Sequence, residues 1–315
     1  MATASDPAPS VPDARIATLA PPGGALEARF AAGAGMACCS LRHRGEELLG
    51  LRGGIEAYLA RGKTFGIPLL YPWANRLGAW EYEVAGRRVV LDRDTSPVRD
   101  EEHGLPIHGV LARAIAWELT AVEDDRLEAQ LDWAPDRPAF AAFPFAHRVL
   151  LRAALGPDAL RIETTVAATA DDPVPVSFGF HPYLAPPGAP RSSWAVELPA
   201  LVHLALDGRG LPSGALEERQ AERFALGERT YDDLFALDAG AGPARFAVSD
   251  GVRRIEVEFE QGFPYAQVFA PPTEDVICFE PMTAPVDALR THDGLRTVAP
   301  GERATAVFVV RVESA

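Results

Sequence analysis

One segment of the sequence presents a histidine that could exchange protons. In VSFGFHPYL, residues 176–184, the alternation of a β-strand places Phe178 and Phe180 on one face and His181 on the other. Gly179 lacks a side chain and would let another molecule approach this face closely. Because imidazole titrates near neutral pH, His181 could act as a general acid or base, or it could be a structural histidine bonded to the backbone. The pattern alone does not decide between these roles.

A second segment ends in a carboxylate. In EDVICFEPMTAPVDAL, residues 274–289, Ile277 and Phe279 share one strand face, Glu280 lies on the other, and Pro281 ends the run. A carboxylate at the end of a mostly apolar strand is either paired and structural, or positioned at the rim of a sheet as a base. Both interpretations of Glu280 stay open at this point.

A third segment combines aromatic and polar side chains. GIPLLYPWANRLGAWEYEVAGRRVVL, residues 66–91, runs from an apolar stretch into Asn75 and Arg76, which Trp73 and Trp80 frame. Aromatic rings can stack on the C–H faces of sugars, whose hydroxyl groups need directional partners. The segment therefore suits carbohydrate binding, but the same aromatic residues could be ordinary core.

Metal binding is not predicted, although three histidines could be combined into a metal site. His103 lies shortly before His108, and the two could be combined with His181 into one site. Metal sites need a compact ligand set, and the sequence contains no HxH, HxxxH or CxxC spacing. Neighbouring cysteines rarely reach disulfide geometry, so Cys38 and Cys39 are expected to alternate between the faces of a strand. The other histidines considered are expected to be surface or structural residues: His43, His147 and His292.

The elements that would position these residues are short strands. Residues 114–133 contain two alternating runs separated by an acidic turn at residues 123–126, which predicts a hairpin. A second hairpin is predicted where Gly-Pro-Asp at residues 156–158 turns the chain. Helical periodicity is scarce, and residues 285–290 predict at most one short helical turn. Further strands are predicted at residues 253–260, 265–269, 276–280 and 304–312.

The chain as a whole is predicted to be all-β. Its 315 residues are 48% hydrophobic, which is enough for a large core. The strands follow one another without βαβ units, internal repeats or long linkers, and this favours one large antiparallel β-sandwich with few short helices. Residues 1–14 are expected to be a flexible tail, and residues 15–315 a single domain.

Charge and composition argue against several classes of function. The 44 acidic and 30 basic residues give a formal net charge of −14, which disfavours nucleic acid and anionic membrane partners. Lys63 is the only lysine, so Schiff-base chemistry would depend on one residue. The N-terminus lacks the pattern of a signal peptide, and there is no apolar run of about 18 residues. We therefore expect a cytoplasmic protein.

Five segments, in this order, resemble the aldose 1-epimerase family. They are PWANRLG, PIHG, FGFHPYL, YDDLF and CFEPMTAPVDAL, and the likeness covers roughly residues 40–310. The resemblance implies a galactose-mutarotase-like β-sandwich with a shallow sugar cleft. It implies an isomerase that interconverts the α and β anomers of an aldohexose by acid/base-catalysed ring opening and reclosure. Such an enzyme needs no metal or other cofactor, its partner is a small sugar, and we expect a monomer or homodimer.

The resemblance also implies roles for individual residues. His181 matches the acid of the family, which would protonate the ring oxygen, and Glu280 matches the base, which would accept the proton of the anomeric hydroxyl. Asp232, the first aspartate of YDDLF, matches the acceptor for sugar hydroxyls. A carboxylate of Asp232 or Glu280 is expected to keep His181 protonated. The other matching positions imply these substrate-binding residues: Asn75, Arg76, His108, Tyr183 and Gln267.

Three other functions stay open. The segment HGVLARAIAW differs from the HGG-type segment of typical galactose mutarotases and is similar to that of relatives acting on hexose phosphates. A hexose-6-phosphate 1-epimerase would need an arginine cluster, in which Arg113 could join Arg76, whereas the net charge favours neutral aldoses. A catalytically silent carbohydrate-binding sandwich would not need both His181 and Glu280. A glycosidase would need two carboxylates, which Asp232 and Glu280 could supply. Two residues receive no role: Arg113 and Asp233.

Overall fold

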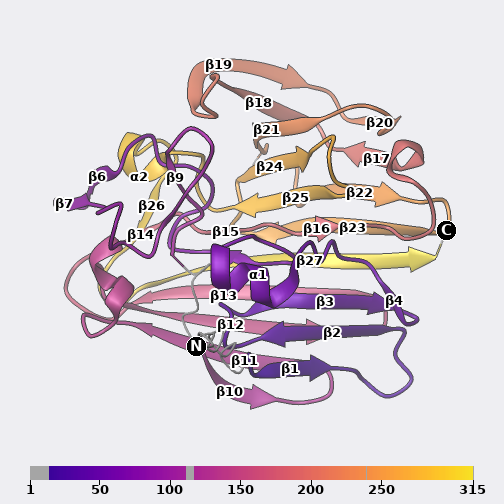
Figure 1. The fold of residues 1–315 in the computed structure, drawn as a ribbon, viewed down its shortest axis with the longest axis horizontal. Coiled ribbons are helices and arrows are strands. Elements are labelled where there is room, and N and C mark those ends of the chain that lie inside the picture. Colours follow the sequence, from indigo (N-terminus) through magenta and orange to yellow (C-terminus); the bar gives the residue numbers. More distant parts are fainter. Residues whose placement is uncertain (1–13, 111–116, 239, 315) are drawn as a thin grey trace, which may run out of the picture.

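Two large antiparallel β-sheets form most of the protein (Figure 1). The computed structural model describes residues 14–110, 117–238 and 240–314. Within these ranges, the nine-stranded sheet has the order β10 (Glu118–Val122), β11 (Arg126–Trp133), β12 (His147–Leu155), β13 (Ala159–Ala168), β27 (Arg303–Ser314), β23 (Arg253–Gln261), β22 (Ala244–Ser249), β17 (Ala195–Leu198) and β20 (Glu222–Ala225). The eight-stranded sheet has the order β19 (Pro212–Arg219), β18 (Leu201–Leu206), β21 (Tyr231–Ala236), β24 (Tyr265–Ala270), β25 (Ile277–Met282), β15 (Gly179–Phe180) and β5 (Leu69–Leu70), and β16 (Tyr183–Leu184) also pairs with β25.

Smaller sheets and short helices complete the described residues. A four-stranded sheet contains β1 (Ile16–Leu19), β2 (Leu26–Ala31), β3 (Ala37–His43) and β4 (Glu46–Glu47). Two-stranded sheets pair β6 (Glu81–Val84) with β7 (Arg87–Val90), β8 (Arg99–Asp100) with β9 (Pro106–Ile107), and β14 (Val174–Val176) with β26 (Arg296–Val298). The helices are α1 (Gly54–Arg61), α2 (Ala288–Thr291) and the 3₁₀ helices η2 (Pro138–Ala142) and η3 (Arg191–Ser193).

The predicted β-sandwich is confirmed, because the two large sheets bury their side chains against each other. Phe308 of β27 contacts Phe180 of β15 with ring centroids 4.8 Å apart, and Phe246 of β22 stacks on Phe279 of β25 at 5.4 Å. All four rings are buried, and burying a phenylalanine side chain contributes about 1.5–3 kcal/mol. Because Phe180 and Phe279 point into this core, the residue that follows each of them faces away from it.

The predicted hairpins and strands are confirmed, and one helix is added to them. β10 with β11 and β12 with β13 form the two predicted hairpins. Cys38 and Cys39 lie on β3, one buried and one half-buried, as strand alternation predicts. Helix α1 was not predicted, because two helical turns are too short to show a clear period. It ends at Gly62, whose φ of 66° is left-handed, and it buries Tyr58 against Phe65.

Two of the expectations from sequence concern residues outside the described ranges. The expected tail, residues 1–14, overlaps these ranges only at residue 14, and Arg113 lies in the stretch 111–116, which they do not include. That residues 15–315 form a single domain stays a prediction. Where the structure describes the chain, no helix combines the length and the apolar character needed to cross a membrane.

Candidate active site

The pairing of neighbouring strands brings the predicted acid and base together. β15 and β16 both pair with β25 in one antiparallel register, so His181, which lies between them, falls opposite Glu280. His181 Nε2 is 3.1 Å from Glu280 Oε1, and the two side chains are only 6% and 2% exposed. Among the described residues, His181 Nδ1 and Glu280 Oε2 have no hydrogen-bond partner. Backbone pairing therefore positions the two groups, and each keeps one buried polar atom without a partner in the described part of the chain.

The glycine before this pair serves the packing of the sheet. A Cβ on Gly179 would lie 2.7 Å from the backbone oxygen of Pro281 in β25. The prediction that Gly179 makes room for another molecule is therefore wrong, because a strand of the chain itself fills that space. Pro281 was expected to end its strand, but β25 continues to Met282.

Burial shifts the proton affinities of both groups toward their uncharged forms. Burial lowers the pKa of His181 well below its usual value, and the positive charges of Arg52 and Arg99 add to the effect. Burial also raises the pKa of Glu280 well above its usual value, with a further contribution from the negative charge of Asp232. Desolvation therefore opposes the expected effect of a neighbouring carboxylate, which was to keep His181 protonated.

Tyr183 connects His181 to a partly buried ion pair. Its ring stacks on the imidazole, with centroids 4.1 Å apart and planes 7° apart, and its hydroxyl lies 3.2 Å from His181 Nε2. Arg52 donates to this hydroxyl over 2.9 Å and pairs with Glu274 over 2.6 and 2.9 Å. Thr64 Oγ1 lies 2.6 Å from the same hydroxyl. Tyr183 therefore orients the imidazole and brings the charge of Arg52 close to it.

The rim of the site is built from β21 and β24. Asp232 accepts a hydrogen bond from Gln267 Nε2 over 2.7 Å, and its other carboxylate oxygen lies 3.5 Å from Arg76 Nη2. The Asp232 side chain is 47% exposed, whereas Gln267 is fully buried and lies opposite Glu280 in the register of β24 with β25. Gln267 therefore holds the Asp232 carboxylate in place through this hydrogen bond.

Two residues in left-handed backbone conformations form the opposite wall. Asn75 has a φ of 54° and His108 a φ of 62°, each of which costs about 1–3 kcal/mol and is often found at functional sites. The His108 backbone N–H donates to the Asn75 carbonyl over 2.9 Å, and Asn75 Oδ1 accepts from the Arg76 backbone N–H over 2.9 Å. The ring of His108 meets His181 edge-on at 5.7 Å. Gly109 has a φ of 64°, and a Cβ there would lie 2.0 Å from a backbone oxygen, so this turn requires glycine.

These side chains line a cavity of about 250 Å³. The structure brings together all of the predicted catalytic and substrate-binding residues, with Gln267 directly below the cavity and the others in its lining. The two framing tryptophans do not line it: Trp73 is buried in the core, and Trp80 donates its indole N–H to the carbonyl of Gly104. Several other lining residues were not predicted from the sequence: Arg52, Thr64, Arg99, Glu101 and Phe269.

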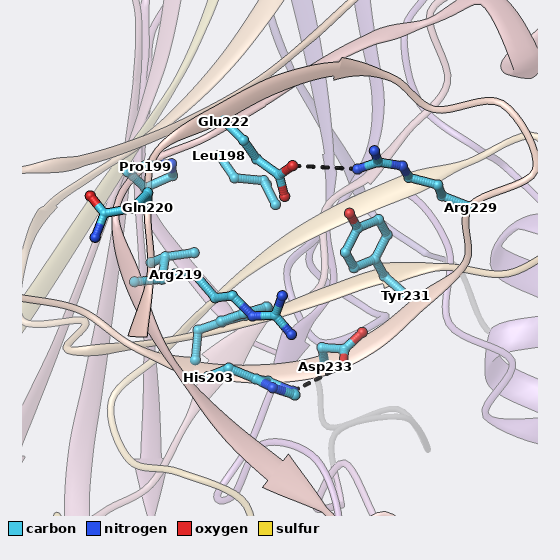
Figure 2. Close-up of a pocket in the computed structure, with 11 residues that line it drawn as sticks. Leu198, Pro199, His203, Arg219, Gln220, Glu222, Arg229, Tyr231 and Asp233 are labelled. Carbon is cyan, nitrogen blue, oxygen red and sulfur yellow. Dashed lines mark hydrogen bonds and ion pairs between the residues drawn. The ribbon is translucent and has the colours of Figure 1, made fainter. Parts of the chain in front are cut away.

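A larger cavity lies on the opposite face of β21 (Figure 2). It measures about 380 Å³ and contains Asp233, which pairs with His203 over 3.0 Å. Glu222 and Arg229 pair over 3.4 Å at its rim. Strand alternation explains why Asp233 and its neighbour Asp232 face different cavities. His203 was not among the residues predicted from the sequence. The charged groups that line this cavity pair with one another. This cavity is therefore not the predicted site.

Three further histidines have structural or surface positions, as expected. His147 is buried between the hydroxyl of Tyr71 and the carbonyl of Phe145, and burial lowers its pKa to about 4. His43 is buried at the end of β3, and His292 is exposed. None of the three lines the candidate site.

One cluster of possible metal ligands occurs in the described part of the chain. Atoms of Glu101, Glu102 and His103 lie within 4.8 Å of one another. His108 and His181, which the sequence suggested as partners of His103, do not belong to this cluster. Exposed acidic clusters of this kind are common without a metal, so the cluster assigns no metal site.

The fold and the site define a β-sandwich protein in which a buried imidazole and carboxylate meet at a polar cavity. The sequence model of the aldose 1-epimerase family matches residues 26–311, and the chain belongs to this family. A comparison with curated proteins finds no match.

Solved structures share the fold over nearly the whole chain. The Slr1438 protein from Synechocystis sp. PCC 6803 has a TM-score of 0.76 at 23% identity, and the likeness covers 100% of both chains. A galactose mutarotase-like protein from Clostridium acetobutylicum has a TM-score of 0.75 at 20% identity, covering 93% of this chain and 94% of that one. The aldose epimerase homologue from C. elegans has a TM-score of 0.74 at 15% identity, covering 95% and 99%. The fold is galactose-mutarotase-like, as the resemblance implied.

Proposed function

We propose that the protein is a mutarotase, which interconverts the α and β anomers of an aldohexose. The observation that carries this proposal is the buried contact of 3.1 Å between His181 Nε2 and Glu280 Oε1 in the lining of a polar cavity. An imidazole and a carboxylate that open to one cavity can exchange protons with two oxygens of one bound sugar. Membership of the aldose 1-epimerase family supports an isomerase acting on carbohydrates.

Ring opening requires one proton to be removed and another to be added. Glu280 accepts the proton of the anomeric hydroxyl, whose electrons form the carbonyl as the bond between C1 and the ring oxygen breaks. His181, in its protonated form, gives its proton to the ring oxygen. The open aldehyde rotates about the C1–C2 bond, and closure on its other face returns each proton to the group that it came from. This proposed route needs no cofactor and no covalent intermediate.

The buried surroundings of the pair favour this exchange. The reactive form of the pair has a charged His181 and an ionised Glu280, and both groups become neutral once the ring is open. Burial lowers the pKa of His181 and raises that of Glu280, which makes the first a stronger acid and the second a stronger base. The charge separation that burial disfavours therefore disappears in the step that breaks the ring.

The other predicted residues are proposed to hold the sugar in place. Asp232 offers a half-exposed carboxylate at the rim, held by Gln267, and Arg76 offers donors beside it. Phe269 lines the cavity edge-on to His181 at 5.6 Å, so it could contact the C–H face of a sugar in place of the buried tryptophans. Three further polar residues of the lining complete this proposed set: Asn75, His108 and Tyr183.

The test is exchange NMR or polarimetry of freshly dissolved α-glucose and α-galactose with the purified protein. We expect a faster approach to the anomeric equilibrium than in buffer alone. Sugar binding without acceleration would instead identify a catalytically silent carbohydrate-binding sandwich, and release of reducing sugar from a glycoside would identify a glycosidase. A cytoplasmic location and a monomeric or homodimeric state stay predictions from the sequence.

A further inference from the structure

Three arginines line the cavity of the candidate site, called the cleft below, and two of them form ion pairs with carboxylates. Arg52 pairs with Glu274 through two hydrogen bonds of 2.6 and 2.9 Å. Arg76 lies 3.3 Å from Glu101 and 3.5 Å from Asp232. Both guanidinium groups therefore face negative charge that the chain itself supplies, and neither needs a ligand to balance it.

Arg99 differs from these two arginines. In the ranges that the structure describes, no carboxylate forms an ion pair with Arg99, and its one hydrogen bond runs from Nη1 to the carbonyl of Gly62 over 3.1 Å. A guanidinium carries five N–H donors, so most of those of Arg99 remain available. Partial burial disfavours the charged form of Arg99 and so lowers its pKa. A partly buried charge without a partner is destabilising, and an anionic ligand would relieve this.

Among the described residues, none of the acidic residues that follow Arg99 in the chain forms an ion pair with it: Asp100, Glu101 and Glu102. Glu101 accepts hydrogen bonds from the backbone N–H groups of His103 and Leu105 over 2.9 and 3.1 Å, in addition to its contact with Arg76. Glu102 is 81% exposed at its side chain and lies near His103. The negative charges of Asp100 and Glu101 raise the pKa of Arg99 again only in part, because desolvation is the larger effect. The chain therefore leaves the positive charge of Arg99 largely unbalanced.

The position of Arg99 gives the cleft a positive end. β8 pairs with β9, and Arg99 lies opposite Ile107, the residue before His108. Burial lowers the pKa of His108 well below its usual value, and the charge of Arg99 is the next largest cause. Near the base, by contrast, the negative charge of Asp232 adds to the raised pKa of Glu280. A sugar with an anionic group would gain most by placing that group at the Arg99 end.

We propose that the substrate is an aldose with an anionic substituent, a carboxylate or a phosphate, and that Arg99 binds this substituent. The inference rests on the proposed function, because it assigns the substrate class of the same cleft. Planar guanidinium groups bind carboxylate and phosphate through paired hydrogen bonds. The net charge of −14 does not oppose this, because physiological salt screens exposed charges beyond about 8 Å. The proposal departs from the sequence-based preference for neutral aldoses, which weighed the net charge against Arg76 and Arg113.

The test compares glucose, glucuronate and glucose 6-phosphate, which share one ring. Exchange NMR gives kcat/KM for mutarotation, and calorimetry gives Kd without requiring turnover. For at least one of the two anionic sugars, we expect kcat/KM to be about tenfold or more above that of glucose, and Kd to be lower by a similar factor. The glucuronate and phosphate arms then show which anion the site binds. Equal values of both quantities for all three sugars would overturn the proposal.

Variants assign the preference to one side chain. Arg99→Gln should reduce the preference for the anionic sugar to about threefold or less, and Arg99→Lys should keep part of it because the charge remains. The matched control is Arg93→Gln, since Arg93 is exposed and stacks on Trp80 at 4.9 Å, outside the cavity lining. It should keep the full preference. Circular dichroism checks folding, and if Arg99→Gln does not fold, the loss in Arg99→Lys is the deciding measurement.

Two outcomes separate this inference from the proposed function. A preference that is unchanged in the folded Arg99 variants would overturn the role of Arg99 while leaving mutarotation established. Absence of catalysed mutarotation for every sugar would overturn the proposed function, and the Kd values would then still decide whether Arg99 binds the anion.

Discussion

The cavity of the candidate site and the larger cavity on the opposite face of β21 each contain a histidine paired with a carboxylate. His181 and Glu280 approach to 3.1 Å. His203 and Asp233, which Figure 2 shows, approach to 3.0 Å. By distance alone the two pairs are equivalent. Their side chains differ in exposure: His181 and Glu280 are 6% and 2% exposed, whereas His203 and Asp233 are 17% and 35% exposed. Water screens the more exposed pair and makes it an ordinary surface interaction, whereas burial strengthens every electrostatic effect on the other.

The neighbours of the two pairs extend this contrast. His203 has a second carboxylate, that of Glu217, at 4.0 Å, and its ring lies over Phe235 at 5.2 Å. Glu280, by contrast, keeps a buried oxygen without a partner in the described residues. A buried polar atom without a partner is destabilising, so its retention indicates a function. Exposure and unmet hydrogen bonds, rather than the distance between the two groups, therefore mark the pair to test first.

Removing the proposed base should have the largest effect. Glu280→Gln preserves the shape but not the basic lone pair, so kcat for mutarotation should fall by about 10³-fold while sugar affinity stays within about tenfold. The matched change on the opposite face, Asp233→Asn, should alter kcat by less than about twofold. Exchange NMR between the anomers measures both. A near-normal rate for Glu280→Gln would remove Glu280 from the mechanism.

Removing the proposed acid should have the next largest effect. His181→Asn should lower kcat by about 10²-fold, because one proton donor is lost and water replaces it poorly. His203→Asn is the control on the other face and should keep the rate. The double variant of His181 and Glu280 should be little slower than the slower single variant, since the two residues act as a unit. Fully additive losses, or equal losses for His181→Asn and His203→Asn, would contradict the comparison.

Removing the charge of Arg52 should have a smaller effect, which should appear in the pH dependence of kcat. After burial, this charge is the largest cause that lowers the pKa of His181. Arg52→Gln removes it, so the pKa of His181 should rise. The limb of the kcat profile that follows the titration of His181 should then move to higher pH by about half a pH unit. Arg52→Lys keeps the charge and should leave the limb in place, so a limb that stays unmoved in Arg52→Gln would disprove this electrostatic role.

Chelation should have the smallest effect. The proposed proton transfers use only His181 and Glu280, and the acidic cluster that contains His103 lies in a separate hairpin. Prolonged treatment with EDTA should therefore leave kcat/KM unchanged to within about twofold. Loss of activity that zinc or manganese restores would revive a metal site built from His103, His108 and His181.

Local alternation was enough to predict which face each proposed catalytic residue occupies. Phe180 and Phe279 enter the core, and His181 and Glu280 therefore face away from it. The contact between them could not be predicted locally, because it depends on the register of strands that lie far apart in the sequence. Only the resemblance to a family joined these two segments before the structure did so.

Residues on turns were beyond what the sequence patterns could show. Arg52 lies in a turn with a φ of 51°, and Arg99 lies in a two-residue strand, so no period marks either of them. The aromatic pattern, by contrast, suggested a binding residue that the structure does not place in the site. Trp73 was considered for stacking on a sugar, but it is buried in the core. Asp232 and Asp233 are chemically identical, and only the family resemblance distinguished them before the sheet placed them on opposite faces.

The acid and the base lie on paired strands, whereas two of the arginines near them come from a turn and a short hairpin. A change in the register of β25 would require several strands to move together. The turn that carries Arg52 and the hairpin that carries Arg99 can vary in length and sequence without such a movement. In evolutionary terms, the proposed reaction and the proposed substrate choice would be carried by separable parts of the chain, so a lineage could inherit the chemistry unchanged while its sugar specificity changes.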